Sequence, residues 1–127
     1  MTAQTAENPA GGLFPVNAGL RLLTGPKRGM EFSLSAASTK VGRASDGVSI
    51  DLSESDPDAN EISREHAIFQ WVGRKLQLVD LGSTNGTFLN GSRVASLEAN
   101  KPSKPCDLMP NDRIIFACVE AEIIIRS

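Results

Sequence analysis

Guanidinium, hydroxyl and amide side chains gather at three places in this 127-residue chain, each beside an apolar run of strand length. They are Val41-Gly42-Arg43, then Ser63-Arg64-Glu65-His66, then the run 80–91, which contains Ser83-Thr84-Asn85-Gly86. Polar residues at strand ends usually serve binding, because loops on a rigid scaffold carry function. This set of donors suits an oxyanion on a peptide better than it suits catalysis.

The elements that must hold these clusters have the pattern of short strands. Apolar residues alternate with polar ones, or form short β-branched runs, at 20–22, 30–34, 76–78, 113–117 and 122–126. Gly, Asn and Pro mark turns at 24–29, 44–47, 72–74, 90–91 and 110–112. No segment has a helical stripe, so we predict an all-β sandwich or barrel. Three prolines in residues 97–110 predict an irregular excursion.

Composition limits the class of protein. The length fits one domain, and 40% hydrophobic with 22% charged residues is ordinary for a globular protein. Residues 1–18 are rich in Ala, Gly, Asn, Thr and Pro and are predicted to be a disordered tail before a domain at 19–127. A net charge of -2 argues against nucleic acid or an acidic membrane surface as the main partner.

The cysteines and the single histidine make a metal site improbable. Cys106 and Cys118 have no C-x-x-C spacing, and a zinc site needs more ligands than His66 adds. We therefore expect no metal and no cofactor, and two reduced thiols in a cytoplasmic protein. The sequence has no signal-peptide pattern and no apolar run of the ~18 residues that span a bilayer.

The three clusters, in this order and with strands between them, resemble the forkhead-associated (FHA) domain family over roughly residues 20–126. The resemblance implies a β-sandwich of about eleven strands with peptide-binding loops at one end. It also implies a non-enzymatic, monomeric module that binds a threonine-phosphorylated protein in Ser/Thr kinase signalling.

Carried over residue by residue, the resemblance assigns five ligands. Arg43 and Ser63 would hold the phosphate, and Arg64 stands where a side chain often faces it. Thr84 would line the phosphothreonine pocket, and Asn85 would hydrogen-bond the peptide backbone.

Three further residues match structural positions of the family. Gly42 and His66 would fix the binding loops, and Gly86 would supply turn geometry that supports them.

Two rival interpretations remain. The first is an FHA fold used for phosphate-independent contact through a sheet face. The retention of Arg43, Ser63, Thr84 and Asn85 disfavours it, because a disused pocket need not keep these four ligands. The second is a hydrolase with Ser63, His66 and Asp80. The spacing of only three residues between Ser63 and His66, and the lack of flanking elbow glycines, argue against it.

The acidic span 50–61 departs from the family pattern. Some relatives place a basic residue two positions before the serine, where it contacts an acidic residue three after the phosphothreonine. Glu61 occupies that position here, so we expect no preference for Asp at +3, and a basic or apolar residue instead. The family's late Gly-Asp turn is replaced by Asn111-Asp112, and Ala117 or Cys118 stands where a glycine often occurs.

Overall fold

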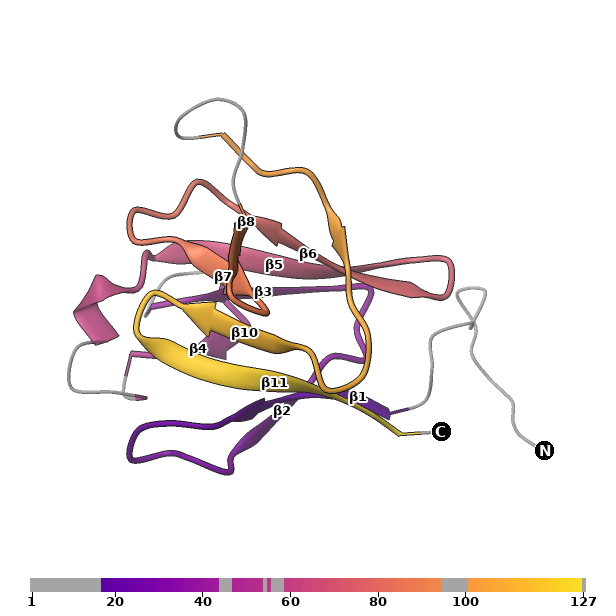
Figure 1. The fold of residues 1–127 in the computed structure, drawn as a ribbon, viewed down its shortest axis with the longest axis horizontal. Coiled ribbons are helices and arrows are strands. Elements are labelled where there is room, and N and C mark those ends of the chain that lie inside the picture. Colours follow the sequence, from indigo (N-terminus) through magenta and orange to yellow (C-terminus); the bar gives the residue numbers. More distant parts are fainter. Residues whose placement is uncertain (1–16, 44–46, 54, 56–58, 95–100, 127) are drawn as a thin grey trace.

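The computed structural model describes residues 17–43, 47–53, 55, 59–94 and 101–126. These residues form eleven strands and one short 3₁₀ turn, arranged as two sheets that pack face to face (Figure 1). The predicted all-β sandwich of about eleven strands is therefore confirmed. Among the described residues, no helix has the length and apolar character needed to cross a bilayer.

The two sheets differ in size. The six-stranded sheet has the order β2 (Glu31–Ser33), β1 (Asn17–Leu22), β11 (Val119–Arg126), β10 (Arg113–Phe116), β7 (Thr87–Leu89) and β8 (Ser92–Val94). The five-stranded sheet has the order β4 (Ile50–Asp51), β3 (Ser38–Gly42), β5 (Glu65–Val72), β6 (Lys75–Asp80) and β9 (Cys106–Asp107). The 3₁₀ turn η1 (Ala59–Glu61) lies between β4 and β5. All pairs are antiparallel except β3 with β4.

Side chains from both sheets meet in one core. The alternation seen in the sequence points Phe69 of β5 and Phe116 of β10 inward, where their rings meet edge to face at 6.2 Å. Trp71 of β5 is also buried, and its indole N–H donates to the carbonyl of Leu34 at 2.7 Å. The sheets are thus joined by apolar packing and by a satisfied polar group.

The predicted turn residues take the backbone conformations that their types favour. Asn90 and Gly91 have φ of 50° and 90° in the two-residue turn between β7 and β8. Asn111 has φ of 70°, so it does take the left-handed conformation in place of the family's glycine. Ala117, at the β10–β11 turn, also has a positive φ, of 56°.

Two segments, the start of the domain and the excursion at 97–110, differ in detail from the prediction. β1 begins at Asn17, so Asn17 and Ala18 belong to the sheet, and residues 1–16 of the predicted tail lie outside the described residues. The excursion at 97–110 contains β9, and it follows β6 further, since Ser103 N–H donates to Asp80 O and Leu108 N–H to Leu76 O, each at 2.8 Å. Residues 97–100 of that excursion also lie outside the described part of the chain.

Loops carrying the polar clusters share one end of the sandwich. In Figure 1, η1, the β6–β7 connection and the β10–β11 turn lie at the left, whereas the β5–β6 hairpin lies at the right. The pairing of Asn17 with Arg126 sets the two described ends of the chain side by side.

A close backbone approach brings two of the clusters together. The register between β3 and β5 shifts at Val41/Gly42, and the amide N–H of Arg43 donates to the carbonyl of Arg64 at 3.2 Å. A Cβ placed on Gly42 would lie 1.8 Å from that carbonyl oxygen. A side chain at position 42 would therefore clash with the backbone of Arg64, so only glycine fits there. The resemblance implied a structural role for this residue.

We expect Gly42→Ala to lower the free energy of unfolding by about 3 kcal/mol or more, because the methyl group meets rigid backbone. Gly73→Ala is the matched control: it has φ of +62° but open space around the added carbon. That variant should lose about 1–2 kcal/mol from backbone strain alone. Urea denaturation of both variants checks this, and equal losses would contradict the steric argument.

Candidate functional site

Arg43 leaves β3 with its guanidinium already anchored. Its Nε donates to the carbonyl of Ile62 at 2.8 Å, which uses one donor and fixes the plane of the group. Its terminal nitrogens have no hydrogen-bond partner among the residues that the structure describes. A planar fork held at its inner nitrogen can present both outer nitrogens to two oxygens of one anion.

Ser63 is tied to the loop that follows β6. Its hydroxyl oxygen accepts the amide N–H of Thr84 at 3.0 Å. A hydroxyl that accepts one hydrogen bond still has its own hydrogen to donate. The side chain is half-buried, so that hydrogen remains accessible to a ligand at the loop surface.

Asn85 makes a second link between the same two loops. Its amide nitrogen donates to the carbonyl of Glu61 at 2.8 Å, while the side chain stays exposed. The amide oxygen remains a potential acceptor for a peptide N–H. Thr84 is also exposed beside it. The structure therefore brings Ser63, Thr84 and Asn85 together, as the sequence predicted.

Arg64 contributes to the site in a different way from Arg43. Its backbone carbonyl accepts from Arg43, but its side chain is exposed, and it has no hydrogen-bond or ion-pair partner among the described residues. The structure places its backbone in the site and leaves a phosphate role for its side chain as a proposal.

His66 holds the loops from beneath. Its ring is fully buried, its Nδ1 lies 3.1 Å from the amide nitrogen of Ser63, and its Nε2 lies 2.9 Å from the carbonyl oxygen of Gly86. An amide can only donate, so Nδ1 must accept and Nε2 must carry the proton. The ring is thus the neutral Nε2–H tautomer. Burial lowers its pKa below 6.5, although the Gly86 carbonyl and the charge of Asp80 oppose this shift.

Gly86 is the point at which three segments converge. Its carbonyl accepts from His66 and, at 3.0 Å, from the amide of Ala117 in the β10–β11 turn. Its own amide donates to the hydroxyl of Ser83 at 3.1 Å. It has φ of 93° and is buried, so both its backbone geometry and its lack of a side chain suit the site.

Asp80 organises the β6–β7 connection, a role that the sequence argument missed. One carboxylate oxygen accepts the amides of Gly82 at 2.9 Å and Ser83 at 3.1 Å. The other accepts the hydroxyls of Ser83 at 2.5 Å and Thr87 at 2.7 Å. An aspartate at the end of an apolar run, with Gly and Ser two and three residues later, is a sequence signal for such a side chain–backbone turn.

This geometry removes the hydrolase alternative. Ser63 meets His66 through its backbone amide, and its hydroxyl is bonded to Thr84. The carboxylate of Asp80 accepts hydrogen bonds from the β6–β7 connection, and His66 Nε2 donates to the carbonyl of Gly86. The three side chains therefore do not form a nucleophile–base–acid relay. In the described part of the chain, no group of three or more His, Cys, Asp or Glu residues could hold a metal ion.

Comparison with known proteins identifies the family of the chain. The FHA domain model matches residues 39–117. Glycogen accumulation regulator GarA from Mycobacterium tuberculosis is 36% identical over 93 residues, covering 73% of this chain and 54% of that protein. The oxoglutarate dehydrogenase inhibitor of Corynebacterium jeikeium is 37% identical over 90 residues, covering 69% and 58%. The chain thus spans little more than half the length of these two relatives.

A solved structure shows the same fold. Mycobacterium tuberculosis EmbR, in complex with a low affinity phosphopeptide, matches with a TM-score of 0.69 and 27% identity. The match covers 87% of this chain and 25% of that one.

The buried neutral His66 predicts a pH dependence of stability. Above pH 6.5 the ring is neutral in both states, and its hydrogen bonds contribute fully. Below pH 6.5 the unfolded chain binds a proton that the folded chain rejects, so stability falls toward the lowered folded-state pKa, by up to about 1.4 kcal/mol per pH unit. Urea denaturation of the unliganded protein between pH 7.5 and 5.5 measures this loss.

His66→Gln is the control, because it removes the chain's single histidine and should flatten the profile. An imidazole that titrates at or above pH 6.5 in the folded protein, observed by NMR, would contradict the prediction.

We expect Asp80→Asn to lower the free energy of unfolding by about 3 kcal/mol. The NH₂ group of asparagine would replace one of the two carboxylate oxygens, so a donor would face either the two buried hydroxyls or the two backbone amides that now donate to that oxygen. Asp107→Asn is the matched control, since its exposed carboxylate accepts from Gln77 and the new amide oxygen can still do so. Thermal or urea unfolding compares the two. A loss at Asp80 no larger than that at Asp107 would refute its organising role.

Proposed function

The chain belongs to the FHA domain family, and we propose that it is a phosphothreonine-dependent peptide-binding module that joins a partner protein after a Ser/Thr kinase has acted. The observation that carries this proposal is the guanidinium of Arg43, which is anchored to the carbonyl of Ile62, the residue before Ser63. The phosphopeptide bound to EmbR supports it by analogy. The net charge of -2 favours a phosphorylated protein over nucleic acid or an acidic membrane as the partner. We further propose that the module is monomeric and acts in the cytoplasm.

The chemistry of the ligand matches the donors on offer. A phosphothreonine carries a charge of about -1.5 to -2 and three strong acceptor oxygens. Arg43 can bind two of these oxygens through its terminal nitrogens, and Ser63 can donate to a phosphate oxygen. Each hydrogen bond to a charged group contributes roughly 1.5–3 kcal/mol. Two or three of them, with backbone contacts, approach the roughly 8 kcal/mol of micromolar binding.

Asn85 supplies the contact that distinguishes a peptide from free phosphate. Its amide nitrogen is bonded to Glu61 O and the residue is exposed, so the amide group is oriented in advance and its oxygen is open to a ligand. We propose that this oxygen accepts a backbone N–H next to the phosphothreonine. Thr84 would line the pocket for the threonine methyl group, whose burial contributes only ~0.8 kcal/mol. Most of any threonine preference would then come from the restricted χ1 of a β-branched residue.

The side chain of Glu61 is exposed, and its carbonyl is held by Asn85. Its negative charge is therefore solvent-accessible on the loop that Asn85 contacts. This supports the proposal that acidic residues at +3 are not selected, which a degenerate phosphothreonine library would measure directly.

We expect Arg43→Ala to weaken binding of a phosphothreonine peptide by about 100-fold, the loss of two charge-assisted hydrogen bonds. Calorimetric titration with phosphorylated and unphosphorylated forms of one peptide measures it. Arg113→Ala is the matched control, because this exposed arginine of β10 pairs with Glu120 away from the phosphate loops. Phosphate-independent binding that survives Arg43→Ala would favour the sheet-face alternative.

A further inference from the structure

Arg93 is an exposed arginine that lies close to the proposed peptide site. It belongs to β8, an edge strand of the six-stranded sheet. A Cβ placed on Gly86 would lie 3.1 Å from Arg93 Nε and 3.2 Å from its Cζ, so the guanidinium occupies the space beside that glycine. Gly86 follows Asn85 in the chain, and neighbouring Cα atoms are about 3.8 Å apart. The Cζ of Arg93 therefore lies no more than roughly 9 Å from the Cα of Asn85.

An aromatic ring holds the guanidinium in this place. Its Cζ lies 5.9 Å from the centroid of the Phe88 ring, within the range of a cation–π interaction. Phe88 and Arg93 are paired across β7 and β8, so their side chains share the outer face of the sheet. A cation that is already oriented loses less entropy when it pairs with an anion of a ligand.

The charge of Arg93 is not neutralised by the described residues. On the same outer face Arg113 pairs with Glu120 at 3.0 Å, and Arg21 pairs with two glutamates, the nearer at 2.9 Å. Arg93 has no hydrogen-bond or ion-pair partner in the part of the chain that the structure describes. An oriented guanidinium without such a partner matches an external carboxylate, whose two oxygens fit its planar fork of donors.

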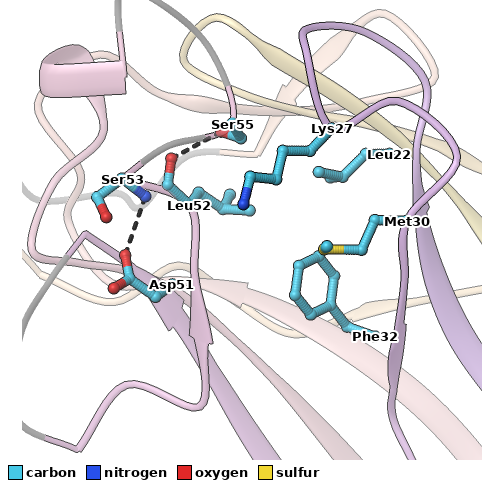
Figure 2. A pocket seen from close by; sticks show the side chains of 8 residues that line it. All are labelled: Leu22, Lys27, Met30, Phe32, Asp51, Leu52, Ser53 and Ser55. Carbon is cyan, nitrogen blue, oxygen red and sulfur yellow. Dashed lines mark hydrogen bonds between the residues drawn. The ribbon is translucent and has the colours of Figure 1, made fainter.

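The cavity between the edge strands β2 and β4 offers no comparable match to one kind of ligand. Its volume is about 250 Å³, and Figure 2 shows the side chain of Lys27 extending across it. Apolar side chains such as Phe32 and polar ones such as Ser53 line it together. A hollow of mixed character that a side chain of the protein already crosses specifies no partner.

The distance from Asn85 limits which peptide residues Arg93 can contact. An extended segment advances ~3.3 Å per residue, so roughly 9 Å corresponds to about three residues. The side chain of an acidic residue adds a little more reach. An anion that pairs with Arg93 would therefore belong to a residue within about four positions of the phosphothreonine.

Resting on the proposed function, we propose that Arg93 binds an acidic side chain of the same phosphothreonine segment, at a position other than the +3 residue that Glu61 disfavours. The phosphate makes binding depend on the kinase, and the carboxylate distinguishes one phosphorylated segment from another. Arg93 is thus a specificity-determining residue that contacts the peptide beside the phosphate site.

The test uses peptides in which one phosphothreonine is flanked by alanine and serine. A single glutamate, or glutamine as its uncharged analogue, is moved along both flanks. We expect glutamate to bind about five-fold more tightly than glutamine at one position other than +3, the upper end for an exposed ion pair. Calorimetric titration at low ionic strength measures this ratio, and about 0.5 M NaCl should bring it close to one.

Arg93→Gln should also bring the ratio of glutamate to glutamine affinities close to one. Arg93→Glu should reverse the preference, so that lysine at the same peptide position binds more tightly than glutamate. A role of Arg93 in packing against Phe88 alone would not produce this reversal. Arg113→Gln is the matched control, because Arg113 is an exposed arginine of the same sheet face that is already paired with Glu120, and it should keep the ratio.

Each other outcome overturns the proposal. If the glutamate-free phosphopeptide binds through Arg43 but the glutamate scan is flat, Arg93 binds no acidic residue and the proposed function stands. If the preference for glutamate survives Arg93→Gln, another cation such as the exposed Arg64 provides it. If Arg93→Gln weakens the glutamate-free and glutamate peptides equally, Arg93 contacts the phosphate instead. If no phosphothreonine peptide binds, both proposals fail.

Discussion

The binding end of this domain depends on one buried carboxylate. Asp80 is only 6% exposed, and removing an ionised group from water costs several kcal/mol unless hydrogen bonds replace the water. Four donors from the segment after β6 meet it. The segment has little freedom to adopt another shape, because any other shape would leave the charge without those bonds.

A short series of hydrogen bonds connects that carboxylate to the loop that carries Ser63. Ser83, held by Asp80, accepts from Gly86, and Gly86 accepts from the neutral ring of His66. His66 in turn accepts from the amide of Ser63. Two loops that are distant in sequence are thereby set at a fixed separation before any peptide arrives. The entropy of ordering them is lost on folding, so it does not weaken the binding of a peptide.

Most of the fold was predictable from the sequence, because strand alternation and turn residues are local signals. Asn90-Gly91 and Asn111 took positive φ as their chemistry favours. In the site, the sequence grouped Arg43, Ser63 and Asn85, because their side chains have evident chemistry. It missed Asp80, and it could not show that Ile62 O anchors Arg43. Every residue has a carbonyl, so only tertiary structure shows which one is used.

The use of backbone acceptors has a consequence for specificity. The side chain of Arg43 donates to the carbonyl of Ile62, and its backbone amide donates to the carbonyl of Arg64. The side chain of Asn85 donates to the carbonyl of Glu61. Any residue supplies a carbonyl, whereas the side chains of Glu61 and Arg64 are exposed and take no part in these bonds. Their charges can therefore change without disturbing the phosphate donors. In the proposed mode of binding, phosphate recognition and partner choice are physically separable. The phosphate donors are oriented by backbone carbonyls, whereas partner choice would rest on side chains that are free of those bonds.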